Sequence, residues 1–210
     1  MDKIEDLYCE RLNLTPGFME SIGRETDWGF VIKAHALIEA ALTDLFTARF
    51  KEPLLRDIIS TLSTSSEHFS KLSVLKELKL ILKERRAFIR AFSRVRNAFA
   101  HDVRKIDFTL KDYCDEDAKR AAELRAAIAH SFPETLIVET TNPETKARQR
   151  TPTPREKFIM DDLRLALWLA TVASVNELLQ AKACLADPEA PPAGGGKVLI
   201  PHTPSQNPKG

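Results

Sequence analysis

The sequence predicts an all-α fold, a helical bundle with a small loop or hairpin insertion and a flexible C-terminal tail. Apolar residues recur at steps of three and four between Phe30 and Leu45, which places them on one helix face. The segment 165–175 is apolar on nearly every side, as expected of a helix at the centre of a bundle. Half of the 12 prolines fall within residues 187–210, a composition that builds no core.

The first half of the chain is expected to form helices joined by polar loops. Thr26 or Asp27 is placed to cap the first core helix. A short amphipathic helix is expected over 54–62, and the Ser- and Thr-rich stretch 60–66 is typical of a loop. Residues 71–83 have a helical pattern.

The centre of the chain continues this helical pattern. Residues 84–101 form a second helix or continue the one before it. Its apolar stripe consists of Phe88, Phe92, Val95 and Phe99. Residues 117–131 are rich in Ala, Glu, Arg and Lys, which favour a helix.

An insertion at about 132–154 interrupts the helices. Residues 135–140 are typical of one strand of a small hairpin, and Asn142 with Pro143 is a turn signal. The charged run 148–150 is interpreted as a solvated loop. We expect this insertion at the surface.

The chain is therefore divided into three parts. Residues 1–25 form an N-terminal extension, residues 26–186 a helical domain, and residues 187–210 a disordered tail rich in Pro and Gly. A single long helix over 155–185 is expected to close the domain.

Composition excludes several classes of function. The chain has 31 basic and 30 acidic residues among 210, so any basic site must be local. Cys9, Cys114 and Cys184 lie far apart and support neither a disulfide framework nor a zinc site. No apolar stretch reaches the ~18 residues of a membrane span, and the N-terminus lacks the apolar core of a signal peptide. We expect a cytoplasmic protein with no metal, no cofactor and no membrane contact.

The run from Arg96 through Asn97 to His101 carries the strongest chemical signal. Arginine is a permanent cation that can clamp a phosphate with two hydrogen bonds. Histidine moves protons near neutral pH. Without metal ligands, the two suit attack by a ribose 2′-hydroxyl on its own phosphodiester, with Asn97 orienting the imidazole or the substrate.

Helix geometry sets a condition on this pair. Arg96 and His101 diverge by roughly 140° on a regular helix, because each residue turns it by about 100°. Asn97 and His101 share a face, on which Arg90 and Arg94 also fall. Arg96 and His101 can therefore act on one phosphate only if the helix ends near His101 or a second subunit completes the site. A two-fold homodimer would make one composite basic cleft.

The hexapeptide 96–101 resembles the Arg-x4-His signature of the HEPN superfamily, closest to the branch similar to the mannitol operon repressor. The flanking pattern has the same order: an early helix over 31–42, a Leu-rich helix, the segment 106–110 after the His, and a long last helix. The resemblance covers roughly residues 26–185.

This resemblance implies a HEPN-like helical bundle that often dimerises. Many members are metal-independent ribonucleases, and the matching residues here are Arg96 and His101, with Asn97 as the polar residue after the Arg. Such an enzyme would be a toxin or defence protein acting on RNA. Members of the repressor-like branch are instead linked to transcription regulation through protein contacts.

Further residues are candidates for supporting or binding roles. Glu39 is placed either to pair with Arg96 or position His101, or to form a surface pair with His35, whose own role is expected to be structural. Arg90, Arg94 and Arg104 are candidates for substrate binding. Arg104 alternatively complements the negative end of the helix.

Two functions remain open on sequence grounds. The first is a metal-independent ribonuclease. The second is a non-catalytic interaction module that binds a protein partner, such as an antitoxin or a regulator. Direct DNA binding is weaker, because no recognition helix is evident. Burial separates the first two: sealed Arg96 and His101 side chains indicate a structural role, whereas a solvent-lined cleft favours catalysis.

Overall fold

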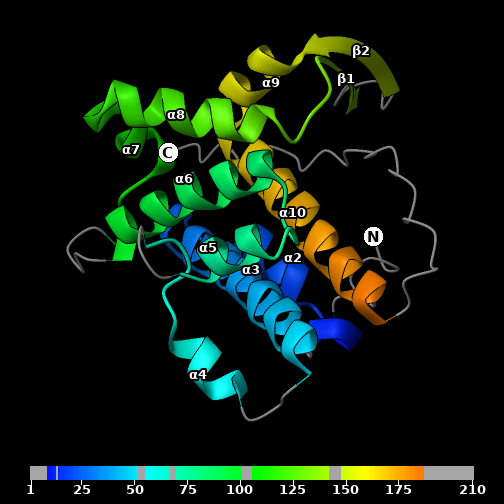
Figure 1. The fold of residues 1–210 in the computed structure, drawn as a ribbon. Coiled ribbons are helices and arrows are strands. Elements are labelled where there is room, and N and C mark those ends of the chain that lie inside the picture. The colour runs from blue at the N-terminus through cyan, green and yellow to red at the C-terminus, as the bar shows by residue number, and fades with distance from the viewer. Residues whose placement is uncertain are drawn as a thin grey trace.

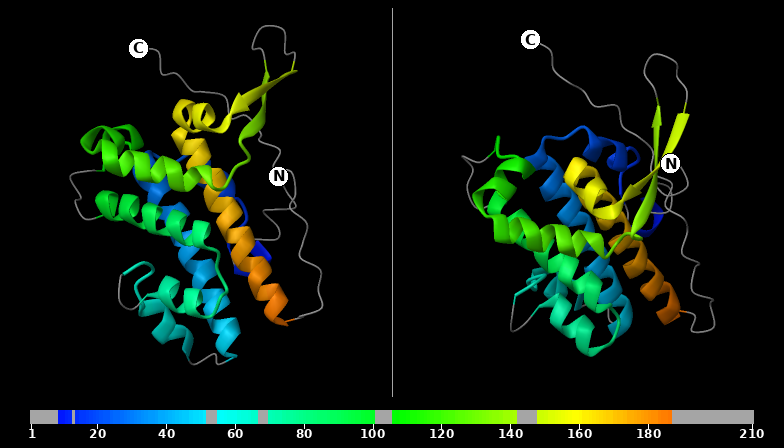
Figure 2. Two further views of the ribbon diagram at one scale, coloured as in Figure 1. Left: turned by 45° about the horizontal axis from the view of Figure 1, so that its top comes forward. Right: turned by 90° about the horizontal axis from the view of Figure 1, so that it is seen from above.

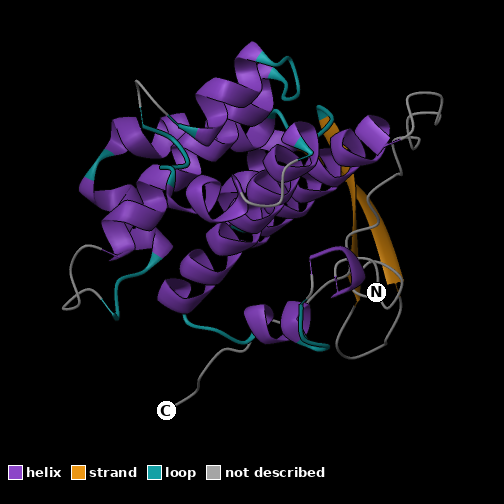
Figure 3. Ribbon diagram, turned by 60° about the horizontal axis from the view of Figure 1, so that its bottom comes forward, coloured by secondary structure: helices purple, strands orange, loops and turns teal. Residues whose placement is uncertain are grey.

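The computed structural model describes residues 9–12, 14–51, 55–66, 70–100, 106–141 and 148–186. These residues are predominantly helical and include one two-stranded sheet (Figures 1 and 3). The helices are α2 (Phe18–Gly23), α3 (Asp27–Phe50), α4 (Leu55–Thr61), α5 (Lys71–Glu77), α6 (Lys83–Ala100), α7 (Leu110–Glu116), α8 (Ala118–Ala129), α9 (Arg155–Asp161) and α10 (Leu163–Ala186). The predicted all-α class is confirmed.

The two longest helices, α3 and α10, run side by side through the molecule (Figure 2). Helix α6 packs against α3, and α8 packs on α6. Thr26 caps α3, as predicted, because its hydroxyl accepts a hydrogen bond from the Gly29 backbone at 3.3 Å.

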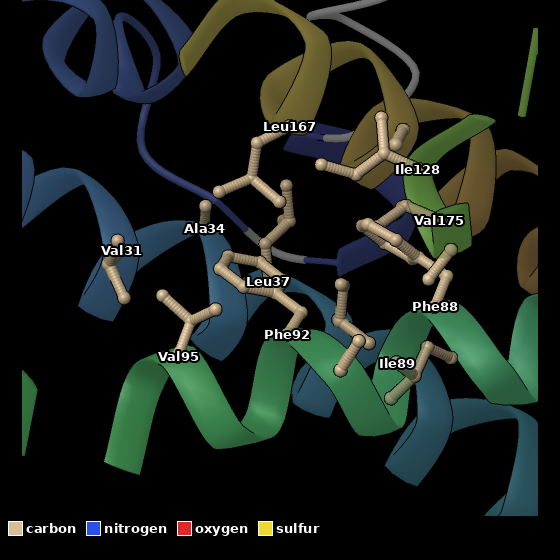
Figure 4. Packing of buried hydrophobic residues seen from close by; sticks show 14 of the residues in the cluster. Val31, Ala34, Leu37, Phe88, Ile89, Phe92, Val95, Ile128, Leu167 and Val175 are labelled. Carbon is tan, nitrogen blue, oxygen red and sulfur yellow. The ribbon is translucent and has the colours of Figure 1, made fainter. Parts of the chain in front are cut away.

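Side chains from these four helices meet in one core (Figure 4). The predicted apolar stripe of α6 is confirmed, since each of its members is at most 1% exposed: Phe88, Phe92, Val95 and Phe99. Facing it are residues of α3, α8 and α10, including Val31, Ala34, Leu37, Ile128, Leu167 and Val175. Burial of this apolar surface is the main force that aligns α6 with α3.

Two helices predicted as continuous are interrupted. The helix expected over 71–83 ends at Glu77, because Lys79 adopts a left-handed conformation with φ 55°. The helix expected over 155–185 breaks at Asp162, whose carboxylate accepts a hydrogen bond from the Leu165 backbone at 2.9 Å and so caps α10. Helix α7 was not predicted. Thr109 begins it with a capping box.

The insertion is a β-hairpin that projects from the helices (Figure 2). Strand β1 (Thr135–Thr141) pairs antiparallel with β2 (Arg148–Pro154), and Leu136 at its base is buried. The hairpin is therefore confirmed, but the solvated loop at 148–150 is wrong, because these residues belong to β2. Asn142, Pro143 and the tail from 187 to 210 lie outside the described residues.

The described part of the N-terminal extension packs on the bundle. Ile22 of α2 is 1% exposed within the core. Arg164 of α10 holds this segment in place by donating to the Asp27 carboxylate at 2.9 Å and to the Glu25 carbonyl at 2.6 Å. In the described ranges, no helix has both the length and the apolar character needed to cross a membrane.

Candidate functional site

A polar pocket of about 310 Å³ lies between α3, α6 and the end of α4 with its following loop. Its walls are His35, Glu39, Ser93, Arg96, Asn97 and residues 60–65. The structure thus brings three predicted site residues together, namely Glu39, Arg96 and Asn97. It adds His35, Ser93 and a run of hydroxyl side chains.

Helical spacing explains why the α6 residues meet. Ser93, Arg96 and Asn97 stand at positions i, i+3 and i+4 of α6 and so share one edge of it. His35 and Glu39 are one turn apart on α3. Because α6 packs against α3, these two polar edges face each other.

Glu39 is the centre of this site. Its Oε1 accepts a hydrogen bond from Thr64 Oγ1 at 2.5 Å. The same oxygen lies 3.6 Å from Arg96 Nη2 and 3.8 Å from His35 Nδ1. Glu39 therefore pairs with Arg96, which was one of the predicted alternatives. It also meets His35, but that side chain is only 2% exposed, so the two do not form a surface pair.

Arg96 is held near the C-terminal end of α6. Its Nη1 donates to Asn97 Oδ1 at 3.0 Å, and the side chain is 33% exposed. Trp28 at the start of α3 donates from its indole Nε1 to the Phe99 carbonyl at 3.0 Å. This bond satisfies one of the last carbonyls of α6 and fixes the position of its end.

His35 is a buried neutral side chain. Its Nε2 lies 3.0 Å from Ser93 Oγ, and its ring packs edge-on against Phe92. Burial lowers the pKa of His35 from 6.5 to about 4; Glu39 opposes this shift, whereas Arg96 and Lys71 add to it. At neutral pH the imidazole is therefore uncharged.

Lys71 adds a buried cation next to the partly exposed Arg96. Its Nζ donates to Thr43 Oγ1 at 2.9 Å and to the Ser60 carbonyl at 3.4 Å. Burial lowers the pKa of this ammonium group. Arg96 and Lys71 both act on His35 as positive charges and Glu39 acts as a negative one, but of the two cations only Arg96 is among the residues that line the pocket.

The other predicted residues are not gathered in the pocket. Arg94 pairs with Glu123 of α8, and Arg90 does not line the pocket. The face expected to be shared by Arg90, Arg94 and Asn97 is thus divided between two environments. His101 and Arg104 lie outside the described residues.

Sequence reasoning missed the inner wall of the pocket. The structural role expected for His35 agrees with its burial and its Ser93 contact, but its place in a pocket wall was not predicted, and the Ser- and Thr-rich stretch was interpreted as an ordinary loop. The four-residue spacing of His35 and Glu39 on one helix face predicted that these two side chains are neighbours, but not the pocket around them. The contacts of Lys71 and Ser93 depend on tertiary packing and left no such pattern.

No protein-family model, curated protein or solved structure matches this chain. In the described part of the chain, no three His, Cys, Asp or Glu side chains converge as a metal-ion site requires. The chemistry of the site must therefore be argued from its own residues.

Proposed function

We propose that this chain is a metal-independent endoribonuclease of the HEPN type, acting as a toxin or defence protein. The 2′-hydroxyl of RNA loses its proton and its oxygen bonds to phosphorus. The P–O5′ bond then breaks, and the departing 5′ oxygen takes up a proton. The products are a 2′,3′-cyclic phosphate and a 5′-hydroxyl.

The observation that supports this proposal is the position of Arg96 and Asn97 on the wall of one polar pocket, where Arg96 is the cation of the lining. A guanidinium there can stabilise the negative charge that develops on the phosphate oxygens. His101, five positions further along, transfers protons. Asn97 orients the substrate or the imidazole, and Glu39 holds Arg96 in place.

A homodimer would complete this site. Two copies of the α6 end, related by a two-fold axis, bring two basic edges to one RNA strand. Arg90, Arg94 and Arg104 then contact flanking phosphates. For Arg94 this requires exchange of its Glu123 partner for phosphate.

The direct test is incubation of the purified protein with labelled RNA in EDTA. We expect cleavage with cyclic-phosphate ends, and a loss of rate of about 100-fold or more for His101→Ala and for Arg96→Ala. Matched controls are His130→Ala and Arg24→Ala, two exposed residues that directly follow α8 and α2. Absence of cleavage, or cleavage by His101→Ala at the wild-type rate, would contradict the proposal.

One set of contacts favours a second candidate, a non-catalytic regulatory module. Arg96 meets Glu39, and Trp28 holds the Phe99 carbonyl, so the motif also stabilises the end of α6. In that case Arg96→Ala lowers the melting temperature, and neither the wild-type protein nor any variant cleaves RNA. The bundle would then bind a protein partner, such as an antitoxin or a regulator.

A further inference from the structure

The hydrogen-bond network determines which nitrogen of His35 carries the proton. The Ser93 hydroxyl has one hydrogen, and it donates this hydrogen to the Ile89 carbonyl at 2.8 Å. Toward His35 it can only accept, so Nε2 must be the N–H donor in their 3.0 Å contact. Nδ1 of the neutral ring is therefore an unprotonated acceptor.

That acceptor is left without a donor. Nδ1 is buried and has no hydrogen-bond partner among the described residues. Glu39 Oε1, which is also an acceptor, lies 3.8 Å from it. Leaving a buried acceptor without a donor is unfavourable, because the group has lost its hydrogen bonds to water. His35 Nδ1 and Glu39 Oε1 are therefore neighbouring acceptors, and a ligand that places a hydrogen-bond donor between them would satisfy both.

The surrounding charge narrows the class of ligand. Arg96 Nη2 lies 3.6 Å from the same Glu39 oxygen, so a cation and two acceptors converge on one point. Arg96, the cation of the pocket wall, disfavours an ammonium donor and favours a negative group. A hydroxyl next to a phosphate satisfies all three protein groups, and this is the arrangement in a ribonucleotide.

We propose that the pocket binds the ribose-phosphate of RNA, with His35 Nδ1 and Glu39 accepting the 2′-hydroxyl hydrogen while Arg96 contacts the adjacent phosphate. This rests on the proposed ribonuclease function and adds a specificity-determining residue to it. His35 distinguishes RNA from DNA, since only RNA carries the 2′-hydroxyl. Glu39 or Thr64 must shift slightly to admit the hydroxyl, because Nδ1 is covered.

The test uses binding rather than cleavage. Full-length protein with His101→Ala, in EDTA, is titrated by fluorescence anisotropy with three single strands of one sequence: RNA, 2′-fluoro RNA and DNA. Fluorine keeps an RNA-like sugar but donates no hydrogen. We expect RNA to bind about tenfold more tightly than either analogue, as one hydrogen bond to the buried pair implies. Equal binding of RNA and 2′-fluoro RNA, or no binding at all, would overturn the proposal.

Two variants in the same background separate the two ring nitrogens. His35→Gln places an amide near Nε2 and removes the Nδ1 acceptor. His35→Asn places an oxygen near Nδ1 and gives up the Ser93 contact. We expect His35→Gln to lose the preference for RNA and His35→Asn to retain it. A merely structural His35 would change melting temperature in both and the preference in neither.

The two proposals fail separately. If wild-type protein cleaves RNA but binding shows no preference for RNA over 2′-fluoro RNA, the ribonuclease function is supported and the proposed role of His35 is wrong. If wild-type protein cleaves no RNA, yet His35→Gln abolishes a preference for binding RNA, the proposed binding role of the pocket is supported and the proposed ribonuclease function is wrong. Should both His35 variants fail to fold, the 2′-fluoro comparison on the His101→Ala protein still decides.

Discussion

Glu39 determines the character of the site at the scale of single residues. One of its carboxylate oxygens accepts a hydrogen bond from the Thr64 hydroxyl and lies near both Arg96 and His35. It thereby links the loop, α6 and α3. Without this anion, Arg96 and Lys71 would lie near the neutral imidazole with no compensating negative charge. The pocket therefore depends on Glu39, although Glu39 donates no proton to the substrate.

His35 makes the stability of the fold dependent on pH. Its pKa is about 4 in the folded protein and 6.5 when unperturbed, so the unfolded chain binds the extra proton first. This contribution is fully present above pH 6.5 and is lost as pH falls toward 4. We expect a loss of roughly 2 kcal/mol in the free energy of unfolding between pH 7 and pH 5.

Urea unfolding at the two pH values measures this loss. Carboxylates elsewhere also respond to acid, so the useful quantity is the difference between wild type and His35→Gln, which has no imidazole to protonate. That difference should shrink by about the same amount from pH 7 to pH 5. A difference independent of pH would show that His35 is not held neutral by the fold.

Caps decide where the helices begin and end. Thr26 could be recognised from sequence because a capping residue directly precedes an apolar pattern. Asp162 could not, because the apolar pattern runs through it from α9 into α10. Lys79 gave no signal either, since lysine has no intrinsic preference for the left-handed conformation that it adopts here.

The bond from Trp28 to α6 is an element-scale device that can be tested alone. Trp28→Phe keeps the apolar ring but removes the donor to the Phe99 carbonyl. We expect a loss of about 1 kcal/mol in stability. If the end of α6 positions the site, RNA binding should also weaken.

Hydrogen exchange locates this effect. Amides in the last turn of α6 should exchange faster in Trp28→Phe, while those of α10 should keep the wild-type pattern. Thr26→Ala is the matched control, because it removes the cap of the neighbouring turn without touching α6. Equal acceleration along both helices would mean that the loss is global and that Trp28 does not act on the end of α6.

At the scale of the whole molecule, the sequence predicted the helical class and only part of the site. Periodicity identifies a buried face, as the α6 stripe shows, because burial follows helical spacing. It does not identify the partner of that face. Arg94 was grouped with Asn97 by spacing, yet in the structure Arg94 forms an ion pair with Glu123 of α8. The place of His35 in the pocket was not predicted, because its neighbours Ser93 and Lys71 are distant in sequence.

Substitutions in the core should therefore lower the free energy of unfolding much more than substitutions in the hairpin. Phe92 is fully buried where α3 and α6 meet, and its ring also supports His35. We expect Phe92→Ala to lower the free energy of unfolding by about 4 kcal/mol, because the cavity removes contacts from several helices at once. That is a large share of the 5–15 kcal/mol typical of a domain.

Ile137 of β1 is the matched contrast. It is 57% exposed on a hairpin that projects from the bundle, so Ile137→Ser should change stability by no more than about 0.5 kcal/mol. Chemical denaturation of the two variants beside wild type measures both values. A comparable loss in the two would contradict the arrangement of one helical core with an attached hairpin, because the hairpin would then share the packing that holds α3 against α6.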